Sequence, residues 1–505
     1  MRSDGNSIGL NYSRLEFERE ECRVAANGFV GRAAELARLD ALLARVGDAR
    51  RDLPGVAVLL RGRRRVGKSR LVQVFCERAG VPSVFFQASQ GADPAAERVA
   101  FAAAVGESEL PGRDLFADGT VLPTWTAVFR QLAAALPADS PSIVVIDELP
   151  WLIDADPALE GTLQTAWDTM LARKPVLFVL IGSDLAMMER LDDYRRPFHQ
   201  RGTVMVLPAL NPAEVGSMLD LPAAEAIDAY LVTGGLPLIC QEWRPGESVE
   251  NFLGESLADP TAALLVSGER SLAAEFPGYL QARSVLTAIG NGERTWSGVR
   301  AAMSSGVEPM AASSLTNALR LLEAKRVIAV DTPLSVKPAE KDRRYRVADP
   351  YLRFFLAFVE AGLPLVERGR ADLLLRRVRR SWTTWRGRAV EPVIREALLR
   401  IAPELGWSEV EAVGGWWNRQ NNPEIDLVGA DRQGAATRIL FTGSIKWQTV
   451  KPFDRHDHAT LVRDTAAVPG AGSATELLAV SRNGVAADLP IRTVGPDDLI
   501  AAWRA

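Results

Sequence analysis

The sequence has little of what builds disulfide, metal or membrane-spanning structure. Its 505 residues include 3 cysteines and 3 histidines. Cys22, Cys76 and Cys240 are odd in number and widely spaced, which argues against a disulfide framework or a zinc site. So few histidines also argue against a His-based metal site. The apolar run 176–182 is far shorter than the roughly 18 residues of a membrane span, so no transmembrane helix is expected.

The N-terminal segment and the charge balance set further limits. Residues 1–27 lack the apolar core and cleavage site of a secretion signal, so we expect a flexible leader and a cytoplasmic protein. The net charge of -4 gives no overall attraction to nucleic acid. Local patches would have to supply such attraction. One is present, because Glu367 to Arg400 contains ten arginines against four acids.

Hydrophobic patterns divide the chain into regions. From residue 56 to about 210, apolar runs alternate with amphipathic stretches, which is typical of a parallel sheet covered by helices on both faces. We predict an α/β nucleotide-binding core over residues 28–210. Three short helices and a hairpin then indicate a winged helix-turn-helix over residues 271–350, with 311–326 as its recognition-type helix. A helical basic connector, 351–386, leads to a last α/β region, 387–505.

A phosphate-binding motif follows the first strand of this core. The segment GRRRVGKS fits G-x-x-x-x-G-K-[ST] between the strand VAVLL and a helix. Backbone N–H groups and the helix N-terminus are expected to surround phosphates, with Lys68 on the β and γ phosphates and Ser69 on Mg²⁺. The predicted nucleotide-binding residues of this loop are Gly62, Arg63, Arg64, Arg65, Val66, Gly67, Lys68 and Ser69.

Polar residues at later strand ends extend this site. Asp147 and Glu148 end the apolar strand SIVVID, where Asp147 is suited to hold Mg²⁺ and Glu148 to orient an attacking water. Ser183 ends the next strand and is placed to sense the γ-phosphate. Arg201 is a candidate for stabilising charge on the transferred phosphoryl group, and an ordinary surface arginine is an equally good interpretation. ATP and Mg²⁺ are therefore the predicted ligands.

Together these segments resemble the archaeal-type P-loop ATPases of the AAA+-like and STAND-like branch. The resemblance rests on FVGRAAELARLDALL, GRRRVGKS, VVIDELPWL, IGSDLAMM, RPFHQRG and VTGGLPL. It implies a sheet of strand order 5-1-4-3-2, a helical lid over residues 211–270, a winged helix, and a C-terminal domain related to the PD-(D/E)XK restriction-endonuclease-like fold. By position, Gly31 and Arg32 would lie near the adenine and the phosphates. Arg201 would be the arginine finger or sensor. Gly235 and Pro237 would form a lid turn that contacts nucleotide.

The C-terminal region carries an incomplete nuclease pattern. Glu391 fits the helix acid of that fold, Asp426 the strand-end acid and Lys446 the lysine, but Ser444 stands where a second strand acid is expected. Serine does not offset the charge of Mg²⁺ as a carboxylate does, so a degenerate, non-cleaving site is the favoured interpretation. Glu424 is a partial substitute, because residues two apart on a strand face the same side. Active cleavage is the alternative.

Three functional hypotheses follow. The first is a Mg²⁺-dependent ATPase whose nucleotide state controls the winged helix and the nuclease-like module on DNA. DNA would be bound by the winged helix and by the arginine-rich segment, in which Trp382 and Trp385 are interleaved. That segment is equally well interpreted as a solvated connector. The alternatives are a STAND-like switch that binds a protein partner, and an ATP-regulated nuclease. Arg201 acting in trans would imply a homo-oligomer. Further positive charge around the predicted wing comes from Lys325, Arg326, Lys341, Arg343 and Arg344.

Overall fold

The chain forms two compact units. The computed structural model describes residues 29–48, 52–116, 122–191, 193–194, 196, 198–275, 280–292, 294–304, 310–337 and 339–504, so the predicted leader lies outside the described residues. Unit 1 is Met1–Ala209 and unit 2 is Leu210–Ala505. In the described parts of the chain, no helix combines the length and the apolar character needed to cross a membrane.

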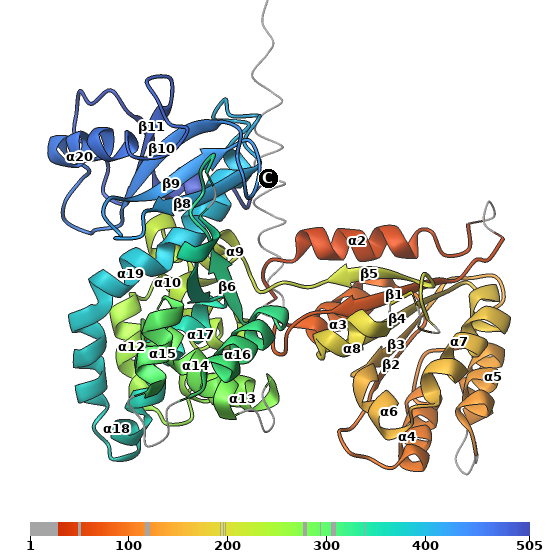
Figure 1. Cartoon of the computed structure of the whole chain (residues 1–505). Helices are drawn as coiled ribbons and strands as arrows, with labels where there is room; N and C mark the ends of the chain where they lie inside the picture. The colour runs from red at the N-terminus through yellow and green to blue at the C-terminus, as the bar shows by residue number, and fades with distance from the viewer. Residues whose placement is uncertain are drawn as a thin grey trace, which may run out of the picture. The chain divides into compact units, whose positions relative to one another are not determined.

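Unit 1 is built around a five-stranded parallel sheet (Figure 1). Its strand order is β2-β3-β4-β1-β5, which confirms the order 5-1-4-3-2 that the family resemblance implied. Continuous apolar runs form the central strands because both faces of the sheet are covered. The strands are β1 (Val56–Arg61), β2 (Ser83–Gln87), β3 (Ser142–Asp147), β4 (Val176–Gly182) and β5 (Gly202–Val206).

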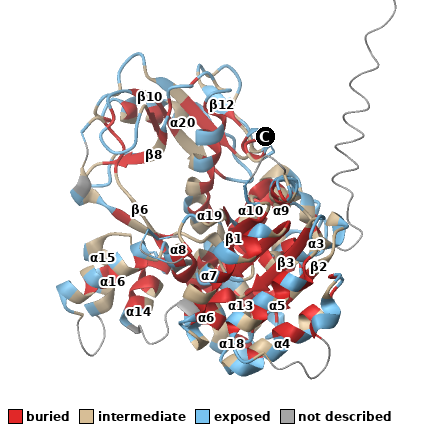
Figure 2. Ribbon diagram, turned by 90° about the vertical axis from the view of Figure 1, so that its right-hand side faces the viewer, coloured by how far each residue is buried: buried red, intermediate tan, exposed pale blue. Residues whose placement is uncertain are grey.

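Helices of unit 1 cover the sheet and form its core. Alternate strand residues such as Leu59, Ile146 and Phe178 pack with α4, α5, α6 and α7 in one buried cluster. Their strand neighbours, Val58 and Val145 among them, are also buried, as the buried strands in Figure 2 show. The helical elements are α2 (Ala33–Leu43), α3 (Lys68–Ala79), α4 (Pro94–Gly106), η1 (Arg113–Phe116), α5 (Trp125–Ala135), α6 (Leu149–Ala155), α7 (Leu159–Thr169), η2 (Leu171–Arg173) and α8 (Leu185–Leu191).

The first part of unit 2 is helical and ends in a hairpin. Three helices, α14 to α16, precede the antiparallel pair β6 and β7, so the elements predicted for the winged helix are present. The elements are α9 (Pro212–Leu219), α10 (Ala223–Thr233), α11 (Pro237–Cys240), α12 (Val249–Ala258), α13 (Ala263–Glu275), α14 (Leu280–Gly290), α15 (Trp296–Ser304), α16 (Ala312–Ala324), β6 (Ile328–Asp331), η3 (Glu340–Asp342) and β7 (Arg344–Val347).

The rest of unit 2 is a long helix followed by a mixed sheet. The sheet has the order β12-β11-β10-β9-β8, in which β8, β9 and β10 are antiparallel and β10, β11 and β12 parallel. The predicted boundary at residue 387 lies inside α19, so the connector and the last region share one helix. The elements are α17 (Pro350–Phe354), the π-helix η4 (Phe355–Val359), η5 (Glu360–Gly362), α18 (Leu363–Glu367), α19 (Ala371–Ile401), β8 (Ala412–Trp417), β9 (Glu424–Ala430), β10 (Ile439–Lys446), α20 (Arg455–Thr465), β11 (Glu476–Ser481), β12 (Arg492–Val494) and α21 (Pro496–Ala501).

The loop between β6 and β7 is docked on this C-terminal sheet. Leu334 enters the hydrophobic cluster of the sheet, and its N–H donates to the carbonyl of Gly415 at 2.9 Å. Ser335, fully buried, forms a parallel bridge with Ala435. The loop of the predicted wing is therefore held by contacts within unit 2, and binding of DNA by this wing stays a prediction.

A buried ionic cluster joins three parts of unit 2. Asp228 on α10 accepts hydrogen bonds from Arg386 on α19 at 2.7 Å, from Trp447 after β10 at 2.8 Å and from Arg482 after β11 at 3.1 Å. Arg386 also donates to the Trp447 carbonyl at 3.1 Å. These bonds offset the loss of hydration that burial imposes on the three charges.

Removing the carboxylate of this cluster should be strongly destabilising. In Asp228→Ala the buried Arg386 loses its ion-pair partner, while the partly buried Arg482 keeps Glu225. Breaking a buried ion pair typically costs about 3–5 kcal/mol. Chemical denaturation followed by tryptophan fluorescence measures the change. Asp372→Ala, which removes an exposed carboxylate paired with Arg376, is the control and should leave the midpoint unchanged. Equal midpoints for both variants would contradict a structural role for the cluster.

Candidate nucleotide-binding site and the C-terminal acid cluster

The predicted phosphate loop lies at the carboxyl edge of the unit 1 sheet. It follows β1 and leads into α3, and the last residues of β1 and β4, Arg61 and Gly182, are paired. Gly62 admits no side chain, because a Cβ there would lie 2.5 Å from the Leu207 carbonyl oxygen. Gly67 has φ 91°, a left-handed conformation that favours glycine. Both glycines of the motif are thus required by the backbone.

Lys68 lies folded against its own loop. Its Nζ donates to the carbonyls of Gly62 at 2.9 Å and Arg63 at 3.0 Å, and the side chain is buried. Burial lowers the pKa of Lys68 to about 8, although the charges of Glu148 and Asp147 oppose that shift. The first N–H groups of α3 have no acceptor inside the helix, as at every helix start. A cation and free N–H donors therefore meet where phosphates would bind.

Ser69 and Asp147 form the closest polar contact of this edge. The Ser69 hydroxyl donates to Oδ2 of Asp147 at 2.5 Å, and the N–H of Glu148 donates to Oδ1 at 2.9 Å. Asp147 is 1% exposed, and burial raises the pKa of its carboxyl despite the Ser69 hydrogen bond. A hydroxyl and a carboxylate oxygen are ligands that Mg²⁺ accepts, with phosphates and water completing its shell. The two side chains fit a Mg²⁺–nucleotide site.

Glu148 and Ser183 lie together on the neighbouring strand ends. The Ser183 hydroxyl donates to Oε2 of Glu148 at 2.8 Å, and its N–H does so at 3.3 Å. Glu148 has φ 55°, which turns the chain sharply as β3 gives way to α6. The predicted water-orienting acid and the predicted γ-phosphate sensor are thus brought into direct contact.

Arg32 holds the phosphate loop through hydrogen bonds to backbone carbonyls. Gly31 and Arg32 both have left-handed φ, 76° and 67°. The buried guanidinium of Arg32 donates to the carbonyls of Val66 at 3.1 Å and Pro208 at 2.8 Å. These bonds join the loop to the segment after β5. The structure therefore gives Arg32 backbone carbonyls as partners, while its expected contact with phosphates stays a prediction.

Arg201 lies at the opposite edge of the sheet from the phosphate loop. Gly202 pairs with Ala57 near the start of β1, whereas the loop follows the end of β1. That separation is about 15 Å at 3.3 Å per residue, beyond the reach of an arginine. Its Nε and Nη2 each bond Asp168 at 2.8 Å. The structure thus places Arg201 away from the phosphate loop of its own chain, and its role as an arginine finger or sensor in trans stays a prediction.

Gly235 serves a packing role within unit 2. It has φ 66°, its carbonyl accepts from the N–H of Leu210 at 2.9 Å, and a Cβ would lie 1.9 Å from the Leu210 carbonyl oxygen. Pro237 opens α11 at its first turn. These residues fix where unit 2 begins, and the nucleotide contact expected of them stays a prediction.

The acids of the C-terminal cluster are hydrogen-bonded to protein groups. Asp426 accepts hydrogen bonds from the Ser444 hydroxyl at 3.1 Å and the Ile445 N–H at 2.8 Å. Burial and the nearby charge of Glu391 raise the pKa of Asp426 to about 6. Arg395 donates to Glu391 at 3.1 Å and to the Asp426 carbonyl at 2.9 Å. An arginine thus supplies the positive charge that a metal supplies in such a site.

The other two residues of the nuclease pattern also have partners. Arg344 on β7 makes a bidentate ion pair with Glu424, so this carboxylate is not a substitute for the missing acid. Lys446 bonds Asp457 at the start of α20 at 2.7 Å. Within the described residues no three His, Cys, Asp or Glu side chains form a group that could hold a metal.

Sequence reasoning missed the partners that lie far apart in the chain. Arg344 and Glu424 are 80 positions apart in the sequence, and Asp228 and Arg386 are 158 positions apart. Nearer signals were present. Arg395 stands four residues after Glu391, a spacing that places both on one helix face. Within the arginine-rich segment, Arg376 pairs with Asp372 at 2.6 Å and Arg379 with Glu250 at 2.7 Å, so part of its charge is already compensated.

Comparisons with known proteins show only distant relatives. Residues 355–457 match the DUF234 family, described as archaea bacterial proteins of unknown function. An uncharacterized protein of Methanocaldococcus jannaschii is 23% identical over 337 residues, which cover 65% of this chain and 71% of that protein. A Walker-type ATPase of Pyrococcus abyssi is 20% identical, covering 65% of this chain and 96% of its own, with a TM-score of 0.44. The Aeropyrum pernix ORC1 protein, solved in complex with DNA, is 17% identical, covering 69% and 94%, with a TM-score of 0.33.

The low pKa of Lys68 predicts a pH limit on nucleotide binding. Only the protonated amine attracts phosphate, so ATP affinity of the free protein should be constant below about pH 8 and fall about tenfold per pH unit above it. Titration calorimetry at pH 7 to 9.5 measures this. In Lys68→Arg the charge persists throughout this range, so the remaining affinity should not fall. An unchanged wild-type affinity up to pH 9.5 would contradict the assignment.

The raised pKa of Asp426 predicts a stability difference with pH. With a folded pKa of about 6 against an ordinary 3.8, the folded state keeps a proton that the unfolded chain releases. Stability should therefore fall as pH rises from about 4 to 6, by up to about 3 kcal/mol. Asp426→Asn should lose this dependence, so wild type minus variant isolates it in denaturant titrations at pH 4, 5, 6 and 7. Parallel curves would show that Asp426 is not perturbed.

Proposed function

We propose that this chain is a Mg²⁺-dependent ATP hydrolase whose nucleotide state is communicated from unit 1 to unit 2. The observation that carries this proposal is the 2.5 Å contact between Ser69 and Asp147 beside the phosphate loop. It supplies the two protein oxygens of a Mg²⁺–ATP site next to a buried lysine. Bound Mg²⁺ would neutralise developing phosphate charge there. Lys68 would turn from its loop carbonyls to the β and γ phosphates.

Glu148 would act as the water-orienting residue of hydrolysis. Water attacks the γ-phosphorus in line with the departing ADP oxygen, and Glu148 holds this water as its hydrogen-bond acceptor. The Ser183 hydroxyl donates to Glu148 at 2.8 Å, and a γ-phosphate oxygen would compete for that donor. The pair would thereby release Glu148 only when a triphosphate is bound. Since Arg201 is remote on its own chain, an arginine acting in trans would come from a second copy and imply a homo-oligomer.

A slow nucleotide-gated switch with a protein partner is the second candidate. It is favoured by the Glu148–Ser183 bond, because a glutamate held by a neighbour orients water poorly until that bond opens. An ATP-regulated nuclease has less support, since Arg395 and Arg344 neutralise the acids that a metal would need. The docked β6–β7 loop weakens the support for DNA binding by the winged helix. DNA binding by the arginine-rich segment remains part of the proposal.

Glu148→Gln should separate binding from hydrolysis. The amide cannot accept a proton, so turnover should fall by about 10²- to 10⁴-fold while ATP still binds. Phosphate release and ATP titration, each with and without DNA, measure both properties. Glu107→Gln, at an exposed glutamate of unit 1, is the control. Turnover that rises with DNA supports the first candidate, and ATP retention with no DNA response supports the switch. Unchanged turnover in Glu148→Gln would refute the role of Glu148.

A further inference from the structure

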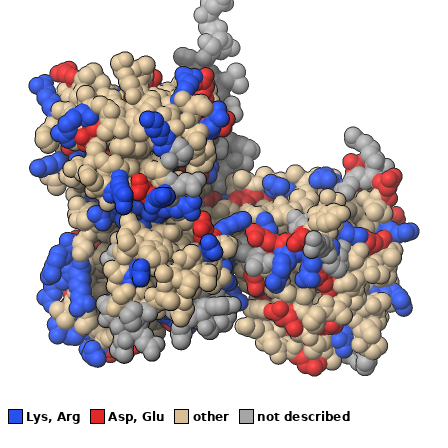
Figure 3. All heavy atoms as spheres, in the orientation of Figure 1, with Lys and Arg blue, Asp and Glu red and all other residues tan. Residues whose placement is uncertain are grey.

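Unit 2 contains a cavity whose wall is rich in arginine. Its volume is about 410 Å³, within the range of small-ligand sites, about 300–1,000 Å³. The wall comes from the loop after α14, the β6–β7 pair, α17, η4 and one face of α19. Figure 3 shows Lys and Arg gathered over this part of unit 2. The arginines of the wall are Arg294, Arg346, Arg353, Arg380, Arg388 and Arg395, against the acids Asp331 and Glu391.

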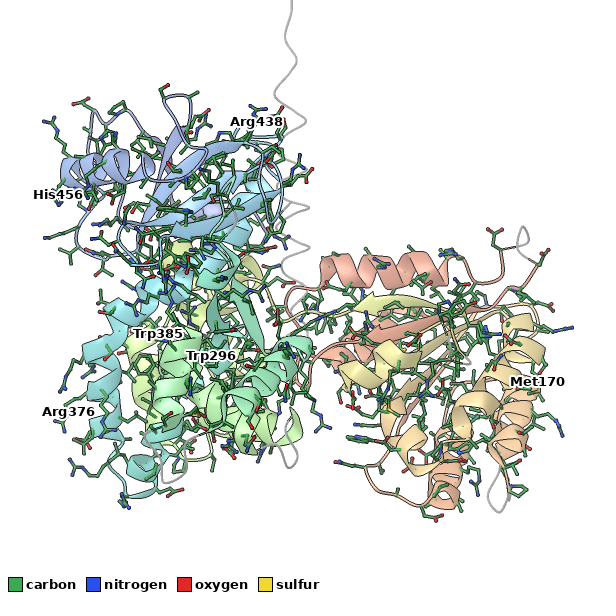
Figure 4. All side chains as sticks on the ribbon, in the orientation of Figure 1. Met170, Trp296, Arg376, Trp385, Arg438 and His456 are labelled. Carbon is green, nitrogen blue, oxygen red and sulfur yellow. The ribbon has the colours of Figure 1, made fainter. Side chains whose placement is uncertain are left out.

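Helix α19 supplies part of this wall from one of its faces. Arg380, Thr384, Arg388, Glu391 and Arg395 line the cavity, at spacings of three or four residues that place them on one helix face. Arg376, on the same helix and labelled with Trp385 in Figure 4, does not line it. The arginines of this helix therefore have different surroundings. Arg376 and Arg379 pair with exposed acids, Arg386 is buried against Asp228, and the cavity is lined by Arg380, Arg388 and Arg395.

The positive charge of the cavity exceeds what its own acids compensate. Arg346 pairs with Asp331 at 3.0 Å and Arg395 with Glu391 at 3.1 Å, so both acids of the wall are used. Arg294 reaches only Glu424, at 3.9 Å, and that carboxylate is held by Arg344. Among the described residues, Arg353, Arg380 and Arg388 have no ion-pair partner. Burial lowers the pKa of Arg353 to about 10, and the charges of Arg346 and Arg294 add to that shift.

Aromatic groups complete the wall. Tyr345, Phe358 and Trp385 line the cavity. Trp385 stacks on Trp382 with ring centroids 5.5 Å apart, which fixes its orientation. The indole N–H of Trp385 is itself buried and finds no acceptor within the described part of the chain. Arginines beside fixed aromatic rings are the combination by which proteins hold single-stranded nucleic acid.

We propose that this cavity binds two or more adjacent phosphate groups, as presented by a nucleic-acid strand or by a free nucleoside polyphosphate. A guanidinium group binds a phosphate group through two parallel hydrogen bonds, and several guanidinium groups in one wall favour a ligand with more than one negative charge. The aromatic wall favours a strand, whose bases stack. The inference does not rest on ATP hydrolysis by unit 1, and its ligand is bound without Mg²⁺ chemistry.

The test is binding of fluorescein-labelled single-stranded DNA to the full chain, in EDTA and without ATP, measured by anisotropy over a range of salt. In Arg380→Gln/Arg388→Gln the affinity should fall at least about tenfold. The slope of log affinity against log salt should lessen by about 1.4, from two lost phosphate contacts. Arg376→Gln/Arg400→Gln removes two exposed arginines of the same helix that lie outside the cavity. It should change affinity less than about twofold, since each already pairs with an acid.

A second arm identifies the source of the phosphate. Tripolyphosphate is titrated into Lys68→Ala, in which the phosphate loop is disabled. Binding of tripolyphosphate that is lost on adding Arg380→Gln/Arg388→Gln, with no binding of DNA, assigns a free polyphosphate. DNA binding that tripolyphosphate displaces only weakly assigns a nucleic-acid strand as the ligand. The inference is overturned if neither probe binds, or if the cavity and control variants lose affinity equally. Arg353→Lys, which keeps the buried charge, guards against misfolding and should weaken binding without lowering stability.

Discussion

A charge buried without a partner costs several kcal/mol, a large share of the margin by which a domain is folded, and this constraint organises both units. In unit 1 it collects Lys68, Asp147 and Ser69 at one edge of the sheet, where each compensates another until a ligand takes over. Parallel strands place their carboxyl ends together, so residues 62–69, 147–148 and 183 meet although the chain separates them widely. The chemistry of the site is a consequence of sheet order.

In unit 2, arginines meet the same constraint by pairing with the acids. Asp228 pairs with the buried Arg386 and the partly buried Arg482, Glu424 pairs with Arg344, and Glu391 pairs with Arg395. A fold with acids in the positions of a metal site, but with Ser444 among them, is stable without the metal because guanidinium groups replace its charge. Replacing a movable divalent ion by a tethered cation removes what activates water.

The fold of unit 1 and the grouping of its candidate site residues were predictable because the signals for them are local. The strand VAVLL, the loop after it and the acids at the end of SIVVID each occupy a few consecutive residues. Parallel pairing of the strands then brings these segments to one edge of the sheet. Arg201 was misplaced because an arginine before a strand looks the same whichever edge it occupies, and only the register of Gly202 with Ala57 decides. The boundary at residue 387 was wrong because Pro392 and the change in composition conceal one continuous helix, α19.

The cavity contains arginines that the pairing of acids and arginines in the described part of unit 2 leaves without an acid. Helix α19 must present Arg386 to Asp228 on one side, and its repeat then sets Arg380, Arg388 and Arg395 on another. Only Arg395 of these three finds an acid. A chain selected for stability alone would gain by replacing the others with neutral residues, since their repulsion raises the free energy of the folded state. Their clustering beside fixed tryptophans is therefore better explained by an anion that the cavity receives than by the packing of unit 2.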